Sequence, residues 1–104
     1  MDYKVIITED AEADMDKFVH YLLFEKKNQQ AACNLIDDFE SAIAILARVA
    51  ESLKMCENQH LKDLGYRRIN FISHRYFMLY RVEKDRVFVD NIFHELQDYE
   101  NKMI

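Results

Sequence analysis

Basic and aromatic residues that could bind a phosphate gather in the second half of the chain, within residues 65–99. Arg67, Arg68 and Arg75 could form a phosphate-facing cluster, because a guanidinium is permanently charged and carries several N–H donors. His94 could act as an acid or a base, since histidine titrates near neutral pH. Tyr99 could stack on a nucleic-acid base. These five residues are the candidate catalytic set, and we expect any active or binding surface to lie here.

Three β-rich runs must position these side chains: Tyr66–Ile72, Tyr76–Val82 and Arg86–Phe93. The breaks between them are too short for a parallel crossover, so the sequence predicts a three-stranded antiparallel meander. Strand alternation sends Arg67 and Arg68 to opposite faces, so only one of them can share a face with a given site. Each candidate also has a purely structural interpretation. The three arginines could be solvated charges at the edge of the sheet. His94 could be bonded to the backbone at a strand end, and Tyr99 could cap the edge of the core.

The first half of the chain predicts one strand and two helices. Asp2–Ile7 is a short β run, and Thr8 suits the N-cap of a helix that ends near Lys26–Lys27. Residues 28–53 have the strongest helical periodicity, with apolar residues at alternating spacings of three and four. The short link between the two helices predicts an antiparallel hairpin. Residues 57–64 are expected to be a connector.

The sequence therefore predicts one α+β domain over residues 1–104, with two layers and the order β-α-α-β-β-β. The first strand is expected to pair parallel to a strand of the meander. The helical hairpin should cover one face of the sheet and leave the other open. Phe77, Leu79 and Arg81 lie on one side of the middle strand, and an apolar patch left there predicts a partner-binding surface or a homodimer.

Composition restricts the class of protein. The chain is acidic, with a formal net charge of −5, although the meander is locally basic, and this argues against general nucleic-acid binding. Cys33 and Cys56 suit a reduced, cytoplasmic protein. No apolar run of about 18 residues predicts a membrane span, and the N-terminus does not resemble a signal peptide. No Cys/His spacing predicts a metal site, and we expect no cofactor.

The order of elements and several stretches of the meander resemble the RelE/ParE family of bacterial toxins from type II toxin–antitoxin modules. The matching stretches are ITEDAEAD after the first strand, GYRRI, HRYFMLYRV and the closing HELQDYE. The resemblance implies a small cytoplasmic toxin that a cognate antitoxin, encoded beside it, holds inactive. RelE-like members cut mRNA on the ribosome, and ParE-like members poison DNA gyrase.

The family's cationic positions are matched only in part. Tyr66 and Arg67 match the aromatic–basic start of a strand, and Tyr99 matches a frequent terminal tyrosine. Phe77 stands where family members often have Arg, and Glu95–Leu96 stands where a cation often follows the closing strand. We therefore expect a toxin that binds a macromolecular target. The alternatives are a ribosome-dependent mRNA endonuclease that uses the candidate catalytic set, and a non-toxic binding module of the same fold.

Overall fold

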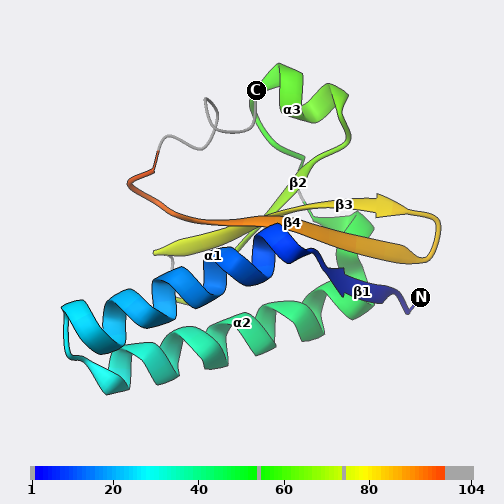
Figure 1. Cartoon of the computed structure of the whole chain (residues 1–104). Coiled ribbons are helices and arrows are strands. Elements are labelled where there is room, and N and C mark those ends of the chain that lie inside the picture. Colours follow the sequence, from blue (N-terminus) through cyan, green and yellow to red (C-terminus); the bar gives the residue numbers. More distant parts are fainter. Residues whose placement is uncertain (1, 54, 74, 98–104) are drawn as a thin grey trace.

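The computed structural model of the chain has a four-stranded sheet packed against two antiparallel helices (Figure 1). It describes residues 2–53, 55–73 and 75–97. The strands are β1 (Lys4–Ile7), β2 (Arg67–Asn70), β3 (Tyr76–Glu83) and β4 (Arg86–His94), and the helices are α1 (Glu9–His20), α2 (Gln29–Val49) and α3 (Gln59–Asp63). The predicted α+β class and the predicted elements are confirmed in their order, and α3 is an addition to them.

The sheet has the strand order β1-β4-β3-β2. β2, β3 and β4 form the predicted antiparallel meander, and β1 pairs parallel to β4, as expected. The β3–β4 register passes from Leu79 opposite Asn91 to Tyr80 opposite Val89. Asp90 is therefore the extra residue of a β-bulge, a feature that bends a strand and redirects a side chain.

Side-chain caps begin the two long helices where the sequence predicts them. The Thr8 hydroxyl accepts a hydrogen bond from the backbone N–H of Ala11 at 3.3 Å, and the Asn28 side chain accepts one from Ala31 at 3.0 Å. α1 continues into a π-helical turn over Tyr21–Glu25 before the chain reverses. These features fix the hairpin whose closed end forms part of the candidate site.

α2 is shorter than the predicted helix over residues 28–53. Its α-helical part ends at Val49, a 3-10 turn follows over Ala50–Ser52, and Leu53 is extended. The buried carbonyl of Ala50 accepts a hydrogen bond from the Tyr80 hydroxyl at 2.7 Å. A sheet side chain thus satisfies a carbonyl that a longer helix would have used internally, which the apolar spacing alone could not indicate.

The main core lies between the sheet and the helical hairpin (Figure 1). Leu35, Ala42 and Leu46 of α2 are buried there against the apolar side chains of the sheet. Phe39, part of the same predicted stripe, is only partly buried and its ring centroid lies 6.4 Å from that of Phe71. The periodicity therefore predicted which face of α2 packs on the sheet. Phe39, in the middle of that face, is less buried than its neighbours in the stripe.

A second apolar cluster covers part of the opposite face of the sheet. Leu61 of α3 and Cys56 bury Phe77, Leu79 and Phe93, and the Leu61 side chain is fully inaccessible. α3 lies on the side of the sheet away from α1 and α2 (Figure 1). The expectation that this face is open is therefore wrong around β3, because the segment predicted to be a connector folds over it.

None of the helices in the described ranges combines the length and apolar character that crossing a bilayer requires.

Candidate functional site

The structure brings together only part of the candidate catalytic set. Arg75, just before β3, and His94, at the end of β4, line one pocket. Arg67 instead donates to the Leu53 carbonyl at 2.5 Å. Arg68 donates to the Asn70 side chain at 2.8 Å, and its guanidinium lies 3.6 Å from the centroid of the Phe77 ring. Tyr99 lies outside the described residues. Arg67 and Arg68 diverge, as strand alternation predicted.

The pocket has a volume of about 820 Å³ and lies between the closed end of the helical hairpin and one end of the sheet. The register places His94 opposite Tyr76, and this pairing brings the end of β4 to the start of β3. The hairpin supplies the other wall with the π-helical turn, the following loop and the first half of α2. The lining residues are Tyr21, Leu22, Lys26, Asn28, Ala31, Asn34, Leu35, Asp38, Ser73, Arg75, Tyr76, His94 and Leu96.

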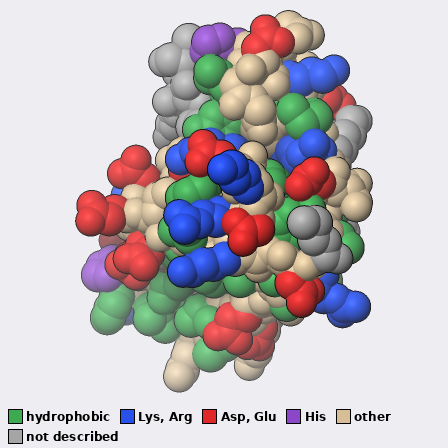
Figure 2. Space-filling model, turned by 90° about the vertical axis from the view of Figure 1, so that its right-hand side faces the viewer, with side chains coloured by type: hydrophobic (Ala, Val, Ile, Leu, Met, Phe, Trp, Pro, Cys, Tyr) green, Lys and Arg blue, Asp and Glu red, His purple; other side chains and the backbone are tan. Residues whose placement is uncertain are grey.

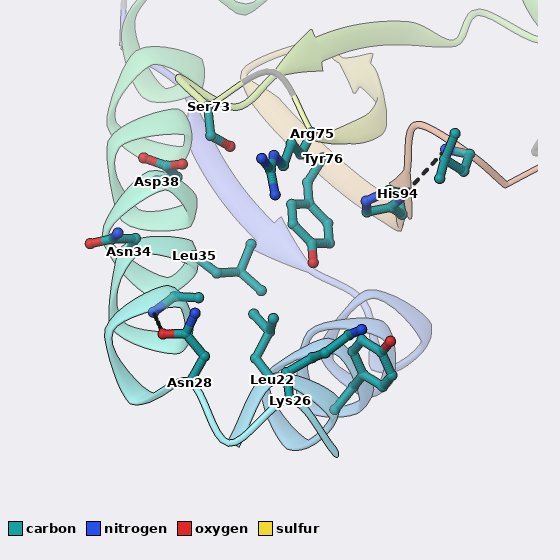
Figure 3. Close-up of a pocket in the computed structure, with 13 residues that line it drawn as sticks. Leu22, Lys26, Asn28, Asn34, Leu35, Asp38, Ser73, Arg75, Tyr76 and His94 are labelled. Carbon is teal, nitrogen blue, oxygen red and sulfur yellow. Dashed lines mark hydrogen bonds between the residues drawn. The ribbon is translucent and has the colours of Figure 1, made fainter. Parts of the chain in front are cut away.

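Figure 3 shows where the apolar and the charged side chains lie around the pocket. Leu22, Leu35 and the Tyr76 ring form its apolar centre, and Arg75 points toward it from the sheet side (Figure 3). Lys26 and Arg75 are exposed cations, and among the described residues neither forms an ion pair. The pocket can therefore hold an anionic group beside an apolar one.

Hydrogen bonds fix the imidazole of His94 in an orientation unsuited to a general base. Its Nδ1 accepts from the backbone N–H of Leu96 at 3.1 Å, so a neutral ring carries its proton on Nε2. The ring also packs edge-on against Tyr76, with centroids 5.0 Å apart. With one nitrogen accepting and the other protonated, the ring offers a substrate a hydrogen-bond donor, not a proton acceptor.

Tyr76 does not supply the missing base either. Burial raises the pKa of its phenol, and this effect exceeds the opposing influence of the Arg75 guanidinium. The hydroxyl therefore stays protonated at neutral pH and acts through hydrogen bonding and ring packing. Among the described residues that line the pocket, Asp38 on the far wall is the only carboxylate, and the other polar groups suit binding.

The hairpin side of this pocket was not predicted from the sequence. The sequence patterns place Lys26 only near the end of a helix, and they do not single out Asp38. Nothing in their spacing indicates that they line one pocket with Arg75, because the packing of the hairpin against the sheet brings them there. The described His, Cys, Asp and Glu side chains form no group of three that could hold a metal ion.

A polar network occupies the opposite face beside the second apolar cluster. The Asp90 carboxylate at the bulge accepts from the Tyr66 hydroxyl at 2.9 Å and from Arg81 Nε at 2.8 Å. Arg81 also pairs with Glu83 at 2.9 Å and lies over the Phe88 ring at 4.6 Å. Positive and negative side chains are intermixed over the end of the molecule that carries the β3–β4 turn (Figure 2). This end lacks the uniform positive charge of a nucleic-acid surface.

The predicted partner-binding residues differ in accessibility. Phe77 and Leu79 are buried beneath the segment that contains α3, whereas Arg81 is partly exposed and held by the Asp90 network. Direct contact of a partner with Phe77 or Leu79 would require that segment to move. Partner binding through Phe77, Leu79 and Arg81 stays a prediction, and so does the formation of a homodimer.

The Tyr66 phenol gives this network a measurable pH dependence. Burial and then the hydrogen bond to Asp90 raise the pKa of Tyr66 from 10.0 to about 12. The folded chain then holds the phenol proton more tightly than the unfolded chain does. The free energy of unfolding is therefore expected to fall as the pH rises from 10.0 to about 12.

Urea unfolding across this alkaline range measures the effect in the wild type and in Tyr66→Phe. We expect a shallower loss of stability in Tyr66→Phe, because that titrating group is gone. Tyr21→Phe, at a tyrosine with 45% exposure, is the control and should retain the wild-type dependence. Equal slopes in Tyr66→Phe and the wild type would contradict the proposed protonation linkage.

The fold defines a class, that of small α+β proteins with a helical hairpin on a four-stranded sheet. Residues 5–99 match the sequence model of the ParE toxin of the type II toxin–antitoxin system, parDE. The chain therefore belongs to this family of toxins, within the RelE/ParE group that its sequence resembles. No curated protein matches it in sequence.

Several solved structures share this fold, among them the two that follow. One is a chain of the chromosomal ParDE toxin–antitoxin system from P. aeruginosa, with 19% identity and a TM-score of 0.68 over 88% of this chain and 95% of that one. The other is a chain of the toxin–antitoxin complex RelBE2 from Mycobacterium tuberculosis, with 18% identity and a TM-score of 0.62 over 91% and 100% of the two chains. At these identities the likeness establishes the fold alone.

Proposed function

We propose that this toxin acts by binding a macromolecular target without cutting RNA, and that DNA gyrase is the target to test first. The match to the ParE family model over residues 5–99 supports this choice, because ParE-like toxins poison gyrase. The pocket formed by the hairpin end, Arg75 and His94 is the proposed contact site. Its exposed cations and apolar centre suit an acidic and apolar segment of a protein target.

The observation that carries the proposal is the separation of the cations needed for RNA cleavage. Cleavage through the 2′-hydroxyl requires a base, an acid and positive charge around one phosphate. Arg67 is bonded to the Leu53 carbonyl and Arg68 is stacked on Phe77, so neither joins Arg75. The His94 Nδ1 lone pair is taken by a backbone N–H. The exposed cations and apolar side chains of the pocket therefore favour binding, because its described residues do not bring these three groups to one phosphate.

A cognate antitoxin is the proposed regulator. One similar structure is described as a toxin–antitoxin complex and the other as a ParDE toxin–antitoxin system. Membership of a type II toxin family gives the same expectation. Co-expression with the product of the adjacent gene should restore growth and yield a co-purifying complex.

The alternative function is ribosome-dependent mRNA cleavage. It is favoured by one observation, the presence of Arg75 and His94 in a single pocket. A rearrangement of residues after β4 on the ribosome could release the His94 lone pair from Leu96. For this endonuclease function, the side chains of Arg75 and His94 must both contact the same phosphate.

A purified-protein assay on mRNA, with and without translating ribosomes, separates the two functions. We expect no cleavage by the wild type, His94→Ala or Arg75→Ala. Ribosome-dependent cleavage that disappears in either variant would overturn the binding proposal. Arg86→Ala, at an exposed strand residue outside the pocket, is the matched control for loss of one positive charge.

A further inference from the structure

The pocket between the hairpin end and the sheet offers a ligand mostly hydrogen-bond donors. The Asn28 Oδ1 atom accepts from the backbone N–H of Ala31 at 3.0 Å. The Asn34 Oδ1 atom accepts from the Gln30 side chain at 3.0 Å, and the His94 Nδ1 atom accepts from a backbone N–H at 3.1 Å. These three lining side chains therefore have N–H groups left for a ligand, and such groups bind acceptor oxygens.

Two cations add to this excess of donors. Lys26 and Arg75 are both exposed, and neither has an ion-pair partner among the described residues. They reach the pocket from different walls, Lys26 from the hairpin end and Arg75 from the sheet side (Figure 3). The Lys26 ammonium lies 5.8 Å from the centroid of the Tyr21 ring, which holds it against the pocket wall. Two positive charges beside these N–H groups favour an anionic ligand with several oxygens.

The rest of the lining restricts the shape of such a ligand. Leu22, Leu35 and the Tyr76 ring form an apolar centre that suits a flat ring. Asp38, the only carboxylate among the described lining residues, repels a ligand that is anionic throughout, but it can accept hydrogen bonds from the hydroxyl groups of a ribose. The pocket volume of about 820 Å³ lies within the range of about 300–1,000 Å³ that small-molecule sites occupy. A nucleotide combines a compact anion, sugar hydroxyls and a flat ring.

We propose that this pocket binds a nucleoside monophosphate as a small ligand. Its phosphate contacts Lys26, Arg75 and the Nε2–H group of His94. Its base packs on the apolar centre, and its ribose hydroxyls donate to Asp38. No RNA cleavage is implied, because a mononucleotide has no internucleotide bond to break. A nucleotide in the pocket would exclude a protein target from it, and this consequence alone rests on the proposed function.

Calorimetric titration of the purified wild-type protein tests the site. AMP and UMP, a purine and a pyrimidine nucleotide, are the main probes. Adenosine lacks the phosphate, ribose phosphate lacks the base, and inorganic phosphate lacks both base and sugar. We expect both nucleotides to bind, and each partial ligand to bind at least about tenfold more weakly, since it loses either the charge-assisted contacts or the apolar ones.

Two variants and two matched controls place the binding in the pocket. Arg75→Ala and Lys26→Ala each remove a proposed phosphate contact, and we expect each to weaken AMP binding by about tenfold. Arg86→Ala and Lys17→Ala remove an exposed arginine and an exposed lysine outside the pocket, and they should leave the affinity unchanged. Because all four side chains are exposed, the variants should fold, and circular dichroism checks that they do.

Absence of AMP and UMP binding to the wild type would overturn the proposal. A partial ligand that binds as tightly as AMP would also overturn it, because either the phosphate contacts or the apolar centre would then play no part. Equal weakening by the control variants would mean that nucleotides are attracted to positive charge anywhere on the protein. The titration contains no gyrase and measures no toxicity, so the nucleotide site and the proposed function can fail separately.

Discussion

Leu46→Ala is expected to lower the free energy of unfolding by about 2–5 kcal/mol, the range for removing a buried leucine side chain. The Leu46 side chain is fully inaccessible within the core between α2 and the sheet. Removing it leaves a cavity that the neighbouring side chains can fill only in part. Urea or thermal unfolding of the purified protein measures the change.

Ile45→Ala provides the control on the same helix. Ile45 is 41% exposed, so a similar truncation there should cost much less than that at Leu46. Comparable losses at the two positions would mean that α2 is not oriented on the sheet as described. Phe39→Ala should lie between them, because the Phe39 ring is only partly buried.

Asp90→Ala is the second change with a large expected effect. Its carboxylate holds both the Tyr66 hydroxyl and Arg81 Nε, and the side chains of Asp90 and Arg81 are 16% and 33% exposed. Losing it leaves a phenol and a guanidinium without that acceptor. We expect a cost of about 2–3 kcal/mol, between the values for exposed and fully buried ion pairs.

Glu83→Ala removes the other partner of Arg81 and is the matched comparison. The Glu83 side chain is 62% exposed, so its loss should cost less than about 1 kcal/mol. Combining each variant with Arg81→Ala in a double-mutant cycle measures the two pair energies directly. A larger coupling energy for Glu83 than for Asp90 would contradict the assigned role of the bulge.

The helical hairpin and the meander could be predicted because local patterns specify them. Thr8 and Asn28 are side-chain caps, and the apolar spacing of α2 fixes which face it buries. α3 could not be predicted in the same way, because five polar-rich residues around Leu61 are too few to show a period. The wrong expectation of an open face around β3 followed from missing that helix.

The candidate site was predictable only where strand pairing determines it. An antiparallel meander brings the start of β3 to the end of β4, and so Arg75 and His94 line the same pocket. The contact of Arg67 with the Leu53 carbonyl depends instead on where the chain passes after α2. Lys26 and Asp38 join the pocket through the packing of the hairpin on the sheet, which no spacing in the sequence reveals.

Gyrase poisoning can be tested by inducing this protein alone in a bacterial host while DNA supercoiling and the translation rate are followed in parallel. We expect growth to stop and DNA topology to change before translation declines. Arg75→Ala at the proposed contact site should delay both effects, and Arg86→Ala should not. If translation stops first, with cleaved mRNA and unchanged supercoiling, gyrase is not the target and the protein is an endonuclease.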